Sequence, residues 1–241
     1  MIDLLKQAYS LIGKYIEAQE KKEPTHDYCV ILDAGHGSIN PEGDYVTAPS
    51  KMFRHPHREF HKDGWFYEGV FNRQLLAKLA TYLLDMDIPF EVVSHEWKDT
   101  PRHTRVHRVN ELHKKFNGRT WGISIHSNAS QSHNAEGWSV WTSKNRPEVK
   151  PISDRIADVL WRQVDGVGLK MRSQDYIDGD HDYEANFDMV YKTKPPFVLI
   201  ENGFFDNPTD ADWLFDESNQ WKLAKALAEG IQISNQMLFN V

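Results

Sequence analysis

The stretch YCVILDAGHG, residues 28–37, decides how the rest of the chain is interpreted. An apolar run rich in β-forming residues ends abruptly in a loop that contains Gly35 and Gly37. A short, continuous apolar run of this kind is typical of a strand that is buried on both faces. We therefore expect a mainly parallel sheet, with the chemistry at the edge where its strands end.

Two further apolar runs repeat this arrangement, since Trp121–Ile125 leads to His126 and Phe197–Ile200 leads to Glu201. Segments with helical periodicity alternate with the strands, over residues 68–86, 101–116, 147–164 and 219–238. Weaker strands are expected at 90–94 and, as an edge strand, at 137–141. This alternation predicts an α/β fold, a three-layer sandwich with a mainly parallel central sheet of about six strands and helices on both faces.

The beginning of the chain is expected to add an N-terminal helix, because apolar residues in 3–20 recur at the i, i+3, i+4 spacing. We predict a division into residues 1–26, the helix and its linker, and residues 27–241, the main domain. Residues 38–67 lack periodicity and contain several prolines and glycines. A loop of this length in a compact domain is usually functional, and we interpret it as an insertion.

Composition limits the classes of function. The chain has 241 residues and a formal net charge of −7, so a general nucleic-acid binder is not expected. It has one cysteine, which excludes a cysteine-rich zinc framework, so any metal site must use His, Asp and Glu. The N-terminus lacks the pattern of a secretory signal peptide, and no run is long enough to span a membrane. We therefore expect synthesis in the cytoplasm and no membrane insertion.

Four polar residues fall at ends of the expected elements, namely His36, Glu68, His126 and Glu201. Each has a plainer explanation when taken alone: a loop or core histidine, a carboxylate at a helix start, or a structural acid. Together they offer two histidines, one carboxylate and a spare carboxylate. A hydrolytic zinc site needs this combination, with three protein ligands, one open position and a general base.

The residues resemble a known family, the zinc-dependent N-acetylmuramoyl-L-alanine amidases of bacterial cell separation and phage endolysins. Asp33–Gly37 is similar to the family's first zinc motif. Glu68 followed by Asn72 resembles the second motif, and Ser124–Ala129 resembles the third. Glu201-Asn202-Gly203-Phe204-Phe205 resembles the motif that carries the catalytic glutamate. The resemblance extends from about Tyr28 to the C-terminus.

This resemblance implies that His36, Glu68 and His126 bind Zn²⁺ and that Glu201 is the base and proton shuttle. It implies substrate-binding roles for Arg105, in a helix similar to the family's arginine-containing helix, and for Asn128. The implied reaction is hydrolysis of the amide bond between N-acetylmuramic acid and the L-alanine of the peptidoglycan stem peptide, by a zinc-activated water.

Two alternatives stay open at this point. One is a zinc peptidase of a related fold that acts on other peptides. The other is a non-catalytic module of a phage particle that only binds peptidoglycan, although such a module has no need of Glu201. The missing signal peptide favours a phage or prophage lysin, which would act on the cell wall after release.

Some further motifs allow two interpretations each. His55 and His57 could form a second metal site, but we favour an exposed, solvated lid that selects among substrates. The spacing of acidic residues in Asp178–Asp182 hints at calcium, although a surface loop is the simpler explanation. Trp138 and Trp141 could stack on sugar, and packing in the core explains them equally well.

Overall fold

The structure of the protein, a computed structural model, describes residues 26–172 and 179–241. The N-terminal helix predicted over 3–20 lies outside the described residues. That helix, and the domain boundary after residue 26, therefore stay predictions.

A six-stranded sheet in the order β4-β1-β5-β8-β6-β7 forms the centre of the molecule. Its strands are β1 (Cys29–Ala34), β4 (Phe90–Val92), β5 (Thr120–Asn128), β6 (Ser139–Thr142), β7 (Tyr183–Glu184) and β8 (Phe197–Phe204). The first four in the order are parallel, whereas β6 is antiparallel to β8 and β7 is parallel to β6. The mainly parallel sheet predicted from the apolar runs is confirmed.

One expectation about this sheet is wrong, because β6 is not its edge. The two-residue strand β7 pairs outside β6, and Trp141 stacks on Tyr183 with ring centroids 4.7 Å apart. The acidic segment that contains β7 has no apolar run that could have indicated a strand. Its pairing is stabilised by side-chain contacts to distant residues, including an ion pair of Lys150 with Glu184 at 2.7 Å.

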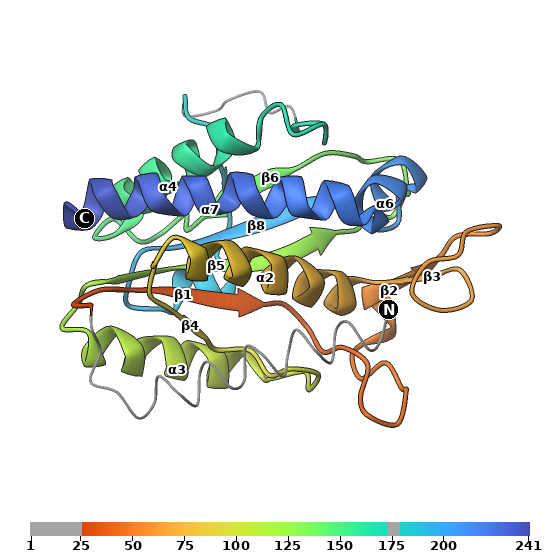
Figure 1. Ribbon diagram of the computed structural model, residues 1–241, viewed down its shortest axis with the longest axis horizontal. Coiled ribbons are helices and arrows are strands. Elements are labelled where there is room, and N and C mark those ends of the chain that lie inside the picture. The colour runs from red at the N-terminus through yellow and green to blue at the C-terminus, as the bar shows by residue number, and fades with distance from the viewer. Residues whose placement is uncertain (1–25, 173–178) are drawn as a thin grey trace.

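Helices cover both faces of the sheet, as predicted. Their bounds are α2 (Glu68–Asp85), α3 (Arg102–Lys115), α4 (Lys150–Val164), α5 (Asp188–Tyr191), α6 (Pro208–Phe215) and α7 (Glu217–Phe239). The helices α2, α4 and α7 pack side by side over one face, and α3 lies apart from them (Figure 1). The short helices α5 and α6 were not expected. The side chain of Asn207 begins α6 by accepting hydrogen bonds from the backbone N–H groups of Thr209 and Asp210.

The core is divided by the sheet into a large and a small part. The large part lies under α2, α4 and α7 and includes Leu75, Ile156 and Leu227, each fully buried. The small part joins Ile31 and Phe197 to Val109 of α3. Strands that contribute to both parts must be apolar on both faces, which explains their continuous apolar runs.

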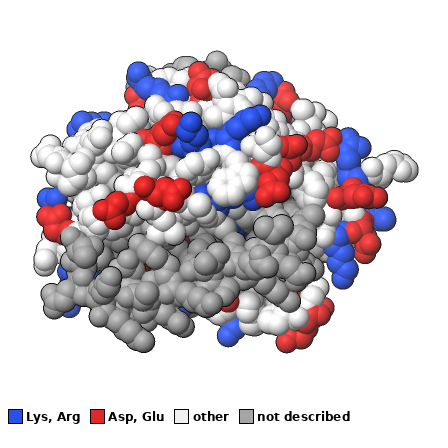
Figure 2. Space-filling model, viewed as in Figure 1, with Lys and Arg blue, Asp and Glu red and all other residues white. Residues whose placement is uncertain are grey.

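Polar groups cover the outside. On the described part of the face in Figure 2, Lys and Arg are interspersed with Asp and Glu. Within residues 26–172 and 179–241, each helix is too short or too polar to cross a membrane.

The insertion at 38–67 has more structure than its sequence predicts. It contains a single 3₁₀ turn, η1 (Pro49–Lys51), and an antiparallel pair of strands, β2 (Met52–Arg54) and β3 (Trp65–Tyr67). Phe60 and Phe66 are buried in the large core. The interpretation of this insertion as exposed and solvated is therefore wrong where its aromatic side chains anchor it to the main domain, whereas residues 41–44, 48–50 and 56–59 are exposed.

Candidate metal centre

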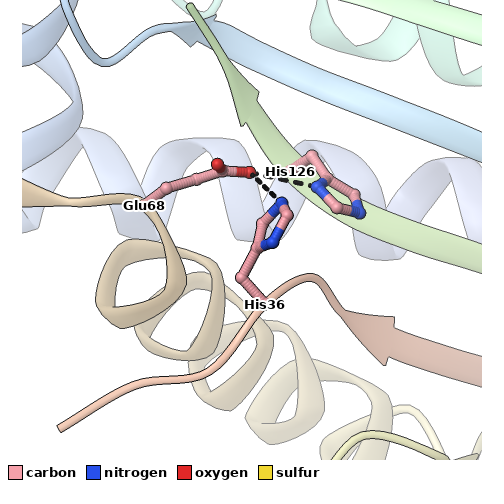
Figure 3. Close-up of side chains that lie close together, drawn as sticks. All are labelled: His36, Glu68 and His126. Atoms are coloured by element: carbon pink, nitrogen blue, oxygen red, sulfur yellow. Dashed lines mark hydrogen bonds and ion pairs between the residues drawn. The ribbon is translucent and has the colours of Figure 1, made fainter. Parts of the chain in front are cut away.

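Three side chains converge where β1, β5 and α2 meet (Figure 3). His36 follows β1, Glu68 is the first residue of α2, and His126 lies on β5. The distance from His36 Nε2 to Glu68 Oε1 is 3.3 Å, and the distance from His126 Nδ1 to the same oxygen is 3.0 Å. One ligand atom from each residue thus lies within 4.8 Å of the other two.

The close approach of these elements requires glycine at two positions. A Cβ atom on Gly35 would lie 2.1 Å from the ring of His126, and one on Gly69 would lie 1.7 Å from the carbonyl oxygen of Gly37. His36 itself has φ +61°, the left-handed region that non-glycine residues rarely adopt. Gly35 of the first motif and Gly69 of α2 are therefore needed for the strand, the loop and the helix to approach one another this closely.

Two buried side chains of α2 hold the loop that carries His36. Asn72 Nδ2 donates to the carbonyl oxygen of Gly35 at 3.2 Å. Arg73 is 1% exposed and donates through Nη2 to the carbonyl oxygen of His36 at 2.6 Å. Arg73 was not expected at the site, because it lies opposite the apolar side predicted for this helix and the sequence carries no signal of its burial.

Electrostatics around Glu68 suit a metal ligand. Burial alone would raise the pKa of Glu68, but the neighbouring His36, His126 and Lys51 outweigh burial and hold this pKa well below its ordinary value. Burial lowers the pKa of His126, against the opposing effect of Glu68. The site therefore favours an ionised carboxylate beside a neutral imidazole, which are the protonation states in which these groups bind metals.

Glu201 lies beside His126, because the two residues are paired in register on the neighbouring strands β8 and β5. Glu201 is within β8, which continues to Phe204, and not after the strand as expected. A shift in strand register between His126 and Asn128 accommodates the longer pairing. Burial and the charge of Glu68 raise the pKa of Glu201 well above its ordinary value, and Lys51 and Arg172 oppose this. Among the described residues, Glu201 Oε2 has no hydrogen-bond partner.

The two residues expected to bind substrate have different surroundings. Arg105 is 4% exposed, and its Nη1 lies 2.7 Å from Asp33 Oδ2, an oxygen that also accepts a hydrogen bond from Ser124 at 2.6 Å. Its Nε donates to the carbonyl oxygen of Thr100. Asn128 is partly exposed at the end of β5, and its Oδ1 accepts the backbone N–H of Ala129.

The structure separates the two histidines considered for a second metal site. His55 is 3% exposed, and its Nε2 lies 2.8 Å from the carbonyl oxygen of Phe205. His57 is exposed. In the described part of the chain, neither histidine belongs to a group of side chains that could hold a metal ion.

A second group of side chains that could hold a metal ion consists of three aspartates. Asp180 and Asp182 lie with Asp154 of α4, and Lys150 contacts Asp154 at 2.9 Å. Asp178 lies outside the described residues, so the calcium interpretation stays untested.

The two tryptophans also differ. Trp138 is fully buried and donates to Asn202 Oδ1 at 2.9 Å, which makes it a core residue. Trp141 is partly exposed and stacks on Tyr183.

Comparison with known families gives one match that covers most of the chain. Residues 30–233 match the family described as N-acetylmuramoyl-L-alanine amidase. The matched range contains the three converging side chains and Glu201.

One relative is 30% identical over 112 residues, the Staphylococcus aureus protein named "Probable cell wall amidase LytH". That match covers 46% of this chain and 34% of the relative, so the chain spans about a third of the relative's length.

Solved structures share the fold at lower identity. An N-acetylmuramoyl-L-alanine amidase from Clostridium difficile 630 is 23% identical with a TM-score of 0.65, covering 86% of this chain and 95% of that one. The N-acetylmuramyl-L-alanine amidase Ami1 from Mycobacterium smegmatis is 19% identical with a TM-score of 0.66, covering 86% and 96%.

Proposed function

The chain belongs to the N-acetylmuramoyl-L-alanine amidase family, and from this premise we propose that it is a zinc-dependent peptidoglycan amidase. It would hydrolyse the amide bond between N-acetylmuramic acid and the L-alanine of the stem peptide. The observation that carries the proposal is the convergence of His36, Glu68 and His126, with Glu201 on the adjacent strand.

The donor set fits zinc. In a tetrahedral site with zinc–ligand distances of about 2.0–2.2 Å, neighbouring ligand atoms are about 3.3–3.6 Å apart. The two distances to Glu68 Oε1, 3.3 Å and 3.0 Å, are close to this separation. Two imidazoles and one carboxylate leave a fourth position open, as in catalytic zinc sites. Held by these three side chains, zinc would polarise the amide carbonyl of the substrate. It would also lower the pKa of water, so that hydroxide is available near neutral pH.

Glu201 would move the proton. Its carboxylate lies on the strand next to His126, so it can take a proton from the attacking water and deliver it to the leaving amine of L-alanine. Burial raises the pKa of the Glu201 carboxyl group. This direction suits proton transfer, because an acid–base catalyst works best with a pKa near the operating pH. Since Glu68 already completes three ligands, we assign Glu201 to proton transfer and not to the metal.

The other residues would support this centre. Asn72 and Arg73 would orient the His36 loop through its carbonyl oxygens. Arg105 would support the site indirectly, because its guanidinium forms a buried ion pair with Asp33 of β1. Asn128 is partly exposed and would contact the substrate. The insertion at 38–67 would border the site and select among peptidoglycan fragments.

Mass spectrometry of digested peptidoglycan tests this proposal. Purified protein with zinc should release intact stem peptides with a free N-terminal L-alanine and leave the glycan strands uncut. Cleavage inside the stem peptide would indicate a peptidase instead. Binding to peptidoglycan without any cleavage would indicate a non-catalytic module.

A further inference from the structure

The two oxygens of the Glu68 carboxylate have different partners. Oε1 faces His36 and His126, and the amide nitrogen of Asn72 lies 3.5 Å from it. Oε2 is buried and accepts no hydrogen bond from any described residue. Its charged neighbour is Lys51, whose Nζ lies 3.5 Å away. A buried carboxylate oxygen is costly without a partner, so the ammonium group of Lys51 compensates the charge that faces away from the histidines.

Lys51 comes from the insertion, and the backbone there is tied to the helix that carries Glu68. The hydroxyl of Tyr45 donates to the carbonyl oxygen of Lys51 at 2.8 Å and accepts the backbone N–H of Gly69 at 3.0 Å. Tyr45 also stacks on Tyr67, with ring centroids 4.3 Å apart. Because Gly69 directly follows Glu68, these contacts fix the lysine and the carboxylate relative to each other.

We propose that Lys51 is a positioning residue that retains Oε2 of Glu68, so that the carboxylate offers only Oε1 to the metal ion. The inference rests on the proposed function in taking that ion to be zinc. A carboxylate can bind a metal ion through one oxygen or through both. One-oxygen binding keeps three protein ligand atoms and leaves the fourth position free, whereas a second oxygen would compete for it.

Positioning of Glu68 would explain why Lys51, a cation, lies beside a site that is proposed to bind another cation. A positive charge near a metal site weakens cation binding, so its presence needs a compensating benefit. The side chain of Lys51 is 34% exposed, and it therefore reaches Glu68 from the solvent side of the site. The insertion would thus contribute to the arrangement of the metal ligands as well as to the border of the site.

X-ray absorption at the zinc edge on zinc-loaded full-length protein tests the inference, with three variants. Lys51→Met removes the charge and keeps an unbranched side chain that is only one atom shorter. Lys51→Arg keeps the charge. Lys62→Met is the matched control, because Lys62 is an exposed lysine of the same insertion. Zinc affinity, from competition with a chromophoric chelator, and turnover per bound zinc are measured on the same samples.

We expect Glu68 to bind zinc through both oxygens in Lys51→Met, which shortens the distance from zinc to the carboxylate carbon in the absorption spectrum, with zinc bound no more weakly than in the parent protein. Turnover per bound zinc should fall about 10- to 100-fold, as for other groups that orient metal ligands. Lys51→Arg and Lys62→Met should keep the parent zinc shell.

An unchanged zinc shell in folded Lys51→Met would overturn the inference, and so would weaker zinc binding, which indicates that the lysine only supports the fold. The absorption result does not depend on the substrate. If the shell changes while the parent protein cleaves no peptidoglycan, the proposed function fails and the role of Lys51 stands.

Discussion

The two sides of the candidate metal centre are held by different kinds of interaction. On one side, His126 and Glu201 lie on β5 and β8, whose backbones are paired along the length of the sheet. On the other side, the insertion is fixed by individual side chains, such as His55 on the carbonyl oxygen of Phe205 and Tyr45 on the N–H of Gly69. The sheet side therefore keeps its geometry through backbone pairing, whereas the insertion side depends on particular residues.

This difference predicts two kinds of variant. Changes to ligands on the sheet side should abolish chemistry while the fold survives, because backbone hydrogen bonds do not depend on the side chain that is replaced. Changes to the anchors of the insertion should mainly lower stability.

The largest effect is expected for His126→Ala. Removing one of the three proposed ligands should reduce both the zinc content and the release of stem peptides to background. Elemental analysis and peptidoglycan digestion measure the two quantities. His107→Ala is the matched control, because His107 is an exposed histidine on α3. Full zinc occupancy in folded His126→Ala would show that His126 is not a zinc ligand.

Glu201→Gln should lose about 10²–10⁴-fold in turnover and keep its zinc, because the amide has nearly the same shape but cannot accept the proton. Zinc content, melting temperature and peptide release are measured on one preparation. Loss of zinc would make Glu201 a fourth ligand. A lower melting temperature with near-normal turnover would make it a structural acid.

A pH dependence of stability is expected from the insertion. Burial lowers the pKa of His61 from 6.5 to about 4, and its Nδ1 accepts the backbone N–H of Tyr67. Between these values the unfolded chain binds a proton that the folded chain does not, so the free energy of unfolding rises with pH in this window. The contribution is complete above pH 6.5 and is lost as the pH falls toward about 4, amounting to about 3 kcal/mol at most.

Urea unfolding of the parent protein and of His61→Gln at several pH values between 4 and 7.5 isolates this contribution. The difference between the two proteins should depend on pH within the window and level off above it. A difference that is independent of pH would show that His61 does not titrate differently in the folded and unfolded states.

His55→Gln should have the smallest effect, a loss of about 1–3 kcal/mol in the free energy of unfolding. The imidazole contact to the buried carbonyl oxygen of Phe205 is lost or weakened, and an unpaired buried acceptor costs about this amount. His57→Asn is the control, because His57 is exposed and has φ +65°, a conformation that asparagine tolerates. Turnover per folded molecule should change far less than in Glu201→Gln. A large loss of turnover with unchanged stability would mean that the insertion acts on the chemistry through His55.

The sequence predicted the sheet side well and the insertion side poorly. The runs ending near His36, His126 and Glu201 indicated buried strands, and the carboxyl ends of parallel strands meet at one edge by the geometry of the sheet. The acidic residue at the start of the helix from 68 was also identified from its position. In contrast, Lys51 and Arg73 gave no periodic signal of their roles, and β7 was too short and too polar to be recognised.

The sheet side was predictable because its signals come from neighbouring residues in the sequence, whereas the insertion side depends on contacts between residues that are distant in the sequence. Periodicity and apolar runs record which face of an element is buried, and this local information was enough to predict the layers of the fold, the mainly parallel sheet and the residues at its edge. The contacts of Phe60 and Phe66 in the core, of Arg73 with the His36 loop and of Lys51 with Glu68 became visible only in the folded chain. Those contacts join residues across turns and separate elements, and their energies depend on distances and burial that exist only once the chain has folded.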